Sequence, residues 1–183
     1  MTKRELLLIG LALLTPALHG CFAAVDRRTS GTYIDDQNIV SKTENLIEEK
    51  YNDKKYANQI HIDVTSFNRF VLLAGEVPNQ EIKDDIGAIA LGVQNVRNVQ
   101  NDLVIGPVTS SGTRANDAYI TSKVISRFTS ENKFRASDVK VVTENGVVYL
   151  KGLVTHKEGD DAAEIASSTS GVKRVVKVFE YID

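Results

Sequence analysis

The chain is built from two similar halves, and this duplication constrains its fold more than any other feature of the sequence. Four pairs of segments match in the same order in both halves, which chance does not readily produce. In chain order, the matching segments are residues 41–42 and 122–123, residues 71–75 and 148–152, residues 89–90 and 165–166, and residues 96–99 and 172–175. A stretch of loop composition, residues 106–113, separates the halves. The sequence therefore predicts two copies of one unit of about 70 residues.

The first element of the unit is clearest in the second half. Three apolar residues there recur at helical spacing, and they are Ile120, Val124 and Phe128. This pattern predicts a helix over residues 116–130, and either Asn116 or Asp117 is a suitable N-terminal cap.

A β-hairpin is predicted to follow this helix. Residues 139–143 and 147–150 are rich in β-branched side chains, and the Asn145-Gly146 pair between them is a strong hairpin signal. In the first half, residues 66–69 occupy the corresponding place, and they predict a turn that is two residues longer.

The last part of the unit is a helix followed by a strand, predicted within residues 153–169 and over residues 172–182. Because a helix leads into the last strand, this strand is expected to lie parallel to one hairpin strand. Asn95 in the first half aligns with Gly171 in the second half. Asn and Gly are the residues that tolerate a left-handed backbone, so a turn with positive φ is predicted before the last strand of each half. Each half is thus an α+β unit of order α-β-β-α-β, with a three-stranded mixed sheet packed against two helices. Since a unit of this size buries only about 60% of its surface, the two units are expected to pack together.

The N-terminal residues have the pattern of a signal peptide. Residues 1–20 combine basic residues with an apolar run too short to span a bilayer comfortably, and they end in Leu-His-Gly before Cys21. This ending resembles the lipobox of bacterial lipoproteins, which implies cleavage before Cys21 and its acylation by chains such as palmitate. Phe22 stands where inner-membrane lipoproteins typically carry Asp, so the same resemblance favours the periplasmic face of the outer membrane. The alternative is an ordinary secretory signal that ends in cysteine.

Together these patterns divide the chain into five parts. They are a signal peptide at residues 1–20, a solvated tether at 21–35, a first domain at 36–106, a linker at 107–114 and a second domain at 115–183.

Composition narrows the classes of function. A single cysteine cannot form an intramolecular disulfide, and the three histidines lie too far apart in sequence to indicate a zinc motif. The net charge of −2 is unlike that of a basic nucleic-acid-binding protein. No cofactor, metal or nucleic acid is therefore expected.

The two halves resemble BON domains. The resemblance rests on an apolar strand predicted to end at Gly75 or Gly152, and on residues 143–155 and 165–175. It implies an outer-membrane lipoprotein of the cell envelope, with the inner leaflet of that membrane as its partner. It also implies that the second domain binds anionic phospholipid such as phosphatidylglycerol, and that the protein supports envelope integrity and gathers at division sites.

Charge also favours the second domain as the partner of an anionic membrane. Residues 36–105 contain 7 basic and 11 acidic side chains, whereas residues 114–183 contain 11 basic and 10 acidic ones. On the predicted helix, Tyr119 and Lys123 lie opposite the apolar residues, as suits a headgroup boundary. The resemblance implies a tryptophan at position 119 in related lipoproteins, which this chain replaces with tyrosine.

The predicted lipid-binding residues are Tyr119, Lys123, Arg127, Phe134 and Arg135. The alternative for Tyr119 is a partly packed surface aromatic surrounded by solvated charges. A second hypothesis for the whole protein is an envelope scaffold that binds protein or cell-wall partners through the acidic first domain.

An enzyme is the least favoured class, because no titratable side chains are expected to converge. Two pairs of adjacent acids, residues 84–85 and 160–161, fall near predicted helix starts, where the helix dipole favours them. His61 is expected on the solvent side of a strand, and His156 in the loop before the second helix.

Overall fold

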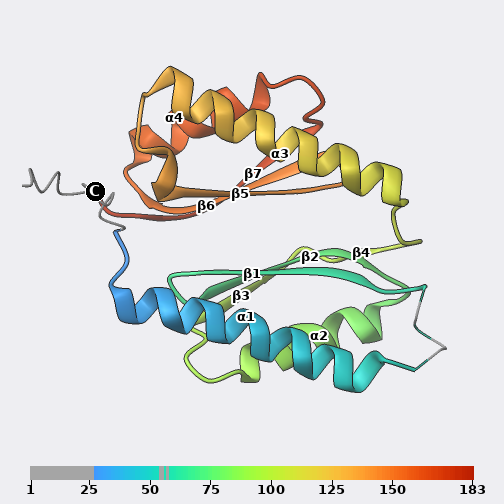
Figure 1. Ribbon diagram of the computed structural model, residues 1–183. Helices are drawn as coiled ribbons and strands as arrows, with labels where there is room; N and C mark the ends of the chain where they lie inside the picture. Colours follow the sequence, from blue (N-terminus) through green and yellow to red (C-terminus); the bar gives the residue numbers. More distant parts are fainter. Residues whose placement is uncertain (1–26, 54–55, 57) are drawn as a thin grey trace, which may run out of the picture.

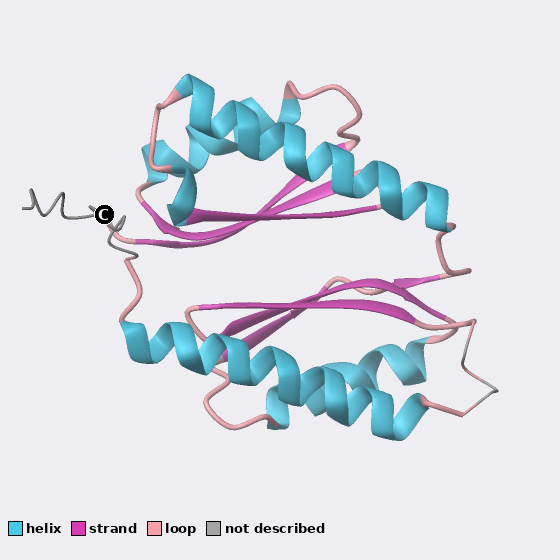
Figure 2. Ribbon diagram, viewed as in Figure 1, coloured by secondary structure: helices cyan, strands magenta, loops and turns pink. Residues whose placement is uncertain are grey.

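The computed structural model describes residues 27–53, 56 and 58–183. Two domains face each other through their sheets, and the helices cover the two outer faces (Figure 1). The result is a four-layer arrangement of helices, sheet, sheet and helices (Figure 2). The prediction that the two units pack together is thereby confirmed.

The first domain follows the predicted order of elements. They are α1 (Ser30–Tyr51), β1 (His61–Phe67), β2 (Phe70–Val77), α2 (Gln80–Gly92), β3 (Asn98–Asn101) and β4 (Val104–Ile105). Strand β2 is central, antiparallel to β1 and parallel to β3. The short β4 also pairs with β2, so the last strand of this domain is split in two. Leu103, between the two pieces, is buried in the core.

The second domain repeats this topology with an unbroken last strand. Its elements are α3 (Ser111–Glu131), the short 3-10 helix η1 (Ala136–Asp138), β5 (Val139–Glu144), β6 (Val147–Val154), α4 (His156–Ser167) and β7 (Arg174–Tyr181). Strand β7 runs parallel to β6 over its whole length. The mixed sheet and the parallel last strand are confirmed in both domains.

Residues with positive φ close the turns as the sequence predicts, with one correction. Asn145 and Gly146 form a two-residue turn with φ of 48° and 77°. The first domain has a turn of the same length, at Asn68 and Arg69, so the prediction of a longer turn is wrong. Before the last strands, Asn95 and Gly171 have φ of 71° and 100°, which confirms that expectation.

The two first helices begin earlier than predicted. Thr29 and Ser110 cap them, and each hydroxyl oxygen accepts a hydrogen bond from the backbone N–H three residues later, at 3.1 Å in both cases. Helix α1 therefore occupies the end of the predicted tether, and α3 begins within the predicted linker. The repeat itself carries this signal, because Thr-Ser-Gly-Thr at residues 29–32 matches Ser-Ser-Gly-Thr at residues 110–113.

Asp117 therefore lies inside α3 and does not cap it. Its buried carboxylate accepts hydrogen bonds from the backbone N–H groups of Asn145 and Gly146 at 2.9 and 2.8 Å. Asp36, at the matching place in α1, binds the N–H groups of the other hairpin turn at 2.9 and 2.7 Å. In both domains a buried aspartate thus fastens the first helix to the hairpin.

Strands β2 and β6 continue for two residues beyond Gly75 and Gly152, which corrects the expectation that they end there. A Cβ atom at these positions would lie 2.1 Å from the carbonyl oxygen of His61 and 2.3 Å from that of Asp138. Glycine is needed at both positions because the backbone of the adjacent segment of the same domain passes very close to them.

The facing sheets share an apolar layer formed by Leu72, Ala74, Val142, Tyr149 and Val178. Lys151 is also buried between the domains, with 1% of its surface exposed. Its ammonium group donates hydrogen bonds to the carbonyl oxygens of Phe70 at 2.6 Å and Thr65 at 3.3 Å. None of the helices in the described part of the chain contains an apolar stretch of the length that a bilayer span needs.

Candidate membrane-contact site

The outer side of α3 presents an aromatic residue beside a cation. The helix buries Ile120, Val124 and Phe128, and Tyr119 on the opposite side is 63% exposed. The Lys123 ammonium lies 5.3 Å from the centre of the Tyr119 ring and donates a hydrogen bond to the carbonyl oxygen of Ser170 at 2.6 Å. None of the ion pairs found among the described residues includes Lys123. Its charge therefore remains available to an anion.

Lys173 adds a second cation near this surface, and it is not among the predicted lipid-binding residues. The loop before β7 packs against α3, since a Cβ atom on Gly171 would lie 3.1 Å from Ile120 Cγ1. The Lys173 side chain crosses over Gly146, and its ammonium donates to Asn145 Oδ1 at 3.0 Å. The matched segments at residues 96–99 and 172–175 carried the signal, because they place a basic residue after each turn. We call Tyr119, Lys123 and Lys173 the α3 face.

Arg127 has a structural task in addition to any part in binding. Its guanidinium donates to the carbonyl oxygen of Ile165 at 2.8 Å and to the hydroxyl oxygens of Ser168 and Thr169, both at 2.9 Å. It also forms an ion pair with Glu131 at 2.6 Å. Arg127 thus ties the C-terminal end of α4 to α3, and its charge is largely neutralised.

Phe134 lies in the core, which corrects its assignment as a lipid-binding residue. Only 7% of its surface is exposed, and its ring packs edge-on against Phe128 with 4.9 Å between ring centres. The apolar ring is buried because η1 folds the chain back against the sheet after α3. Arg135 remains 43% exposed and forms an ion pair with Asp138 at 3.5 Å. The structure therefore brings Tyr119 and Lys123 together and separates Phe134 from them.

The two described histidines differ from expectation. His61 lies on the side of its strand that faces the other domain, where it is only partly exposed, with 3.7 Å between its Nε2 atom and Glu144 Oε2. His156 is the first residue of α4 and not part of a loop. Its ring stacks on Tyr181 at 4.0 Å, and its Nδ1 atom lies 2.7 Å from Asp183 Oδ1.

The adjacent acids near the helix starts form separate local pairs. Asp85 accepts hydrogen bonds from the Lys50 ammonium at 2.7 Å and the Tyr51 hydroxyl at 2.5 Å, and these bonds lower the pKa of its carboxyl group. Asp160 binds Lys177 at 2.6 Å, and Asp161 binds Lys157 at 2.7 Å. The acids are thus engaged in separate contacts and do not converge on one catalytic centre.

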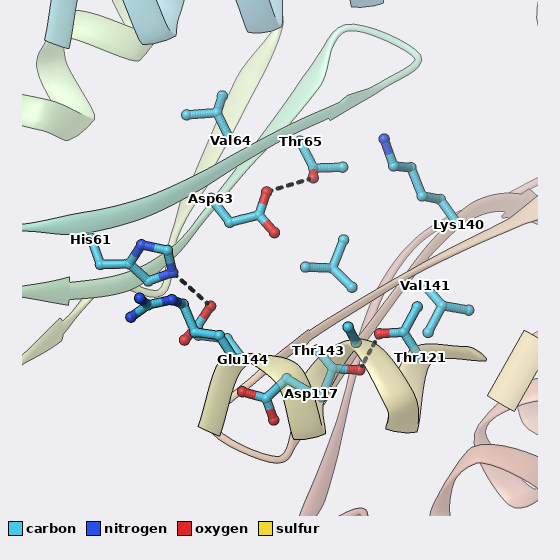
Figure 3. A pocket seen from close by; sticks show the side chains of 13 residues that line it. His61, Asp63, Val64, Thr65, Asp117, Thr121, Lys140, Val141, Thr143 and Glu144 are labelled. Carbon is cyan, nitrogen blue, oxygen red and sulfur yellow. Dashed lines mark hydrogen bonds and ion pairs between the residues drawn. The ribbon is translucent and has the colours of Figure 1, made fainter. Parts of the chain in front are cut away.

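A cleft of about 440 Å³ lies between the domains (Figure 3). The ionisable residues that line it include His61, Asp63, Asp117, Lys140 and Glu144. Burial, together with the nearby carboxylates of Glu76, Asp117 and Asp63, raises the pKa of Glu144 to about 7. Among the described residues, no group of three or more His, Cys, Asp or Glu side chains is arranged to hold a metal ion.

The BON domain model matches this chain twice, at residues 35–107 and 116–183. The outer membrane lipoprotein DolP of Haemophilus influenzae is 39% identical, with 99% of this chain and 97% of that protein covered. A 21 kDa hemolysin of Actinobacillus pleuropneumoniae is 32% identical over 86% of this chain and 80% of its own length. The osmotically-inducible protein Y of Escherichia coli is 29% identical over 79% of this chain and 72% of its length.

Two family matches that each span a folded repeat, together with a relative aligned over nearly the full length, settle the relationship. The chain belongs to the BON-domain family, as a dual-domain protein of the DolP type.

Proposed function

We propose that this protein is a non-enzymatic outer-membrane lipoprotein that binds anionic phospholipid through its second domain. Its lipid anchor is Cys21, on the periplasmic face, and its partner is the inner leaflet of that membrane. The similarity to a protein named as an outer membrane lipoprotein supports this location. Cys21 itself lies outside the described residues. Through this contact the protein supports envelope integrity, and we place its action at division sites.

The observation that carries the lipid proposal is the α3 face. Tyr119 is exposed next to Lys123, whose charge no carboxylate neutralises in the described part of the chain. A basic residue near an anionic membrane contributes about 1 kcal/mol to binding. An exposed tyrosine has an apolar ring and a polar tip, which suits the headgroup boundary. Arg127 and Arg135 contribute only general positive charge, because each already forms an ion pair.

The test is sedimentation of the soluble fragment, residues 22–183, with vesicles of phosphatidylglycerol or phosphatidylcholine. The double variant Tyr119→Ala with Lys123→Ala should lose most of its binding to phosphatidylglycerol. Asn38 and Lys42 occupy the matching places on α1, so Asn38→Ala with Lys42→Ala is the matched control and should bind like the original fragment. Unchanged binding by the α3 variant, or an equal loss in both variants, would contradict the proposal.

A second candidate function, that of an adaptor for envelope proteins, has one supporting observation. A groove between α1 and α2 is lined by the apolar residues Leu46, Ala88 and Ile89, and nearby Leu91 is 57% exposed. In the second domain, Arg127 stands in place of Leu46 and joins the two helices. If the adaptor function is correct, cross-linking from position 46 should capture a protein partner, and the capture should persist when Tyr119 is replaced. Absence of a specific product would argue against this function.

A further inference from the structure

Two adjacent arginines at the start of the described chain bind different domains. Arg27 lies against the second domain, more than 100 residues away in sequence. Its guanidinium donates two parallel hydrogen bonds to the Glu158 carboxylate, both at 2.8 Å, and a third to the carbonyl oxygen of Leu153 at 2.7 Å. Its Nε atom also lies 3.1 Å from Asp138 Oδ2. All three partners lie at the edge formed by η1, the end of β6 and the start of α4.

Arg28 turns to the first domain. Its guanidinium forms an ion pair with the buried carboxylate of Asp36 at 2.8 Å and lies 4.0 Å above the ring of Phe67. It also lies 5.2 Å from the centre of the Tyr33 ring. One peptide bond therefore separates a side chain held by the second domain from one held by the first.

The Arg27 contacts are of the stronger kind. A guanidinium and a carboxylate joined by two parallel hydrogen bonds have a defined geometry that a lysine cannot reproduce. The pair is about three-quarters shielded from solvent, with exposed side-chain fractions of 24% and 21%, and Asp138 is 2% exposed. The hydrogen bond from Arg27 lowers the pKa of Glu158 to about 2, so this carboxylate stays charged at any ordinary pH.

We propose that Arg27 and Arg28 form a clasp that fastens the anchor segment to the folded body, with its membrane-proximal end on the second domain. The inference rests on the proposed acylation of Cys21. Six residues lead from Cys21 to Arg27, and a fully extended chain of that length reaches at most about 21 Å. The clasp therefore keeps the edge of the second domain within this distance of the membrane.

This edge also has apolar groups suited to a lipid surface. Ile182 is 53% exposed and Tyr181 is 41% exposed. The backbone N–H of Ile182 donates to the carbonyl oxygen of Val154 at 3.1 Å, next to the Leu153 carbonyl that binds Arg27. The clasp thus places an exposed tyrosine and isoleucine on the side of the molecule where the anchor leaves it. The partner of this edge is the lipid headgroup region.

The experiment uses the mature acylated protein in nanodiscs of phosphatidylcholine alone, with a fraction of spin-labelled headgroups. Phosphatidylcholine has no net negative charge that could attract the cations of the α3 face. The anchor and its clasp should therefore dominate the orientation of the protein on the membrane. Relaxation enhancement of amide signals should be stronger at residues 153–156 than at α2 of the first domain. Arg27→Ala should abolish this difference and should speed hydrogen exchange of residues 28–33 about tenfold.

Two further variants separate orientation from folding. Glu158→Gln retains a side chain able to complete the capping box with Thr155 but removes the charge, so it should weaken the difference without unfolding α4. Arg97→Ala removes another ion pair between the domains, at 3.1 Å from Glu180, and should leave the difference intact. Equal enhancement of both domains in the original protein, or an unchanged pattern in both Arg27→Ala and Glu158→Gln, would overturn the clasp. Failure of the lipid proposal would appear separately, as absence of phosphatidylglycerol binding by the soluble fragment.

Discussion

The first helices of the two domains share their buried residues and differ on their outer sides. Each begins at a Ser or Thr cap and carries a buried aspartate that binds the hairpin turn. Their charges differ, since α1 has 2 basic and 5 acidic residues whereas α3 has 3 basic and 2 acidic ones. Asn38 on α1 stands in the place of Tyr119 on α3. The duplicated fold thus leaves the outer positions of each helix free to take different tasks.

A second difference lies where the sheets meet. Ala74 and Lys151 occupy matching positions on β2 and β6, and both are buried between the domains. The small alanine leaves space on its sheet, and the lysine reaches the backbone of the first domain. An interface of two unlike surfaces favours association of the two domains within one chain, because two copies of either surface would not complement each other in the same way.

The largest expected effect tests the shared aspartate. Asp36 accepts hydrogen bonds from Arg28, Ser66 and two backbone N–H groups, whereas Asp117 accepts from two backbone N–H groups. Replacing a buried carboxylate leaves these donors without a partner. Asp36→Ala should therefore lower the free energy of unfolding by about 4 kcal/mol, and Asp117→Ala by about 2 kcal/mol.

Urea denaturation of the soluble fragment, followed by circular dichroism, measures both losses. Asp35→Ala is the control, because Asp35 is only half-buried and its hydrogen bond to Asn95 is exposed to solvent. Equal losses of unfolding free energy for Asp36→Ala and Asp117→Ala would show that the number of hydrogen bonds to the aspartate does not determine the size of the loss.

These aspartates also show where sequence reasoning reached its limit. Helical spacing and the Asn-Gly pair were enough to predict the helices and hairpins, because such signals are local. Local sequence makes Asn116 or Asp117 a candidate cap, because the true partners of Asp117, the N–H groups of Asn145 and Gly146, lie far along the chain. Phe134 is predicted to bind lipid because nothing local in the sequence indicates that its ring packs against Phe128 in the core. The clasp at Arg27 depends on contacts with residues more than 100 positions away, which no periodicity reveals.

The pH dependence of stability sharpens the comparison at the interface. Burial lowers the pKa of Lys151 to about 7, so stability should rise as the pH increases from about 7 toward 10.5, where only the unfolded chain keeps this proton. Burial raises the pKa of Glu144 to about 7, so stability should fall as the pH increases from about 4.5 to 7. The two effects together predict a minimum of stability near pH 7, about 2 kcal/mol below the values at pH 5 and pH 9.

Unfolding free energies between pH 5 and 9 measure this minimum. Glu144→Gln should flatten the acid side of the curve, and Lys151→Met should flatten the alkaline side. A curve that keeps its shape in both variants would assign the pH dependence to other groups.

A charge reversal beside the α3 face has a smaller expected effect. Lys173→Glu replaces an attractive side chain by a repulsive one near the membrane, and at about 1 kcal/mol per charge phosphatidylglycerol binding should weaken about 30-fold. The salt dependence of binding should also decrease, since fewer charges take part. Lys140→Glu, at the cleft between the domains, is the matched control. An equal loss in this control would mean that net charge, and not the α3 face, determines binding.

The smallest effect is expected at the counterpart of Lys173 in the first domain. Arg97 forms an ion pair with Glu180 of the second domain at 3.1 Å, with exposed side-chain fractions of 50% and 29%. Exposed pairs of this kind contribute little, so Arg97→Ala should lower the free energy of unfolding by about 0.5 kcal/mol or less, and high salt should remove the difference. Urea denaturation at low and high salt measures this change, and vesicle sedimentation of the same variant should show unchanged lipid binding. A strong loss of lipid binding in Arg97→Ala would show that the first domain also contacts the membrane. Arg97 and Lys173, which align between the two domains, would then both bind lipid. The ion pair with Glu180 indicates instead that Arg97 holds the first domain to the second.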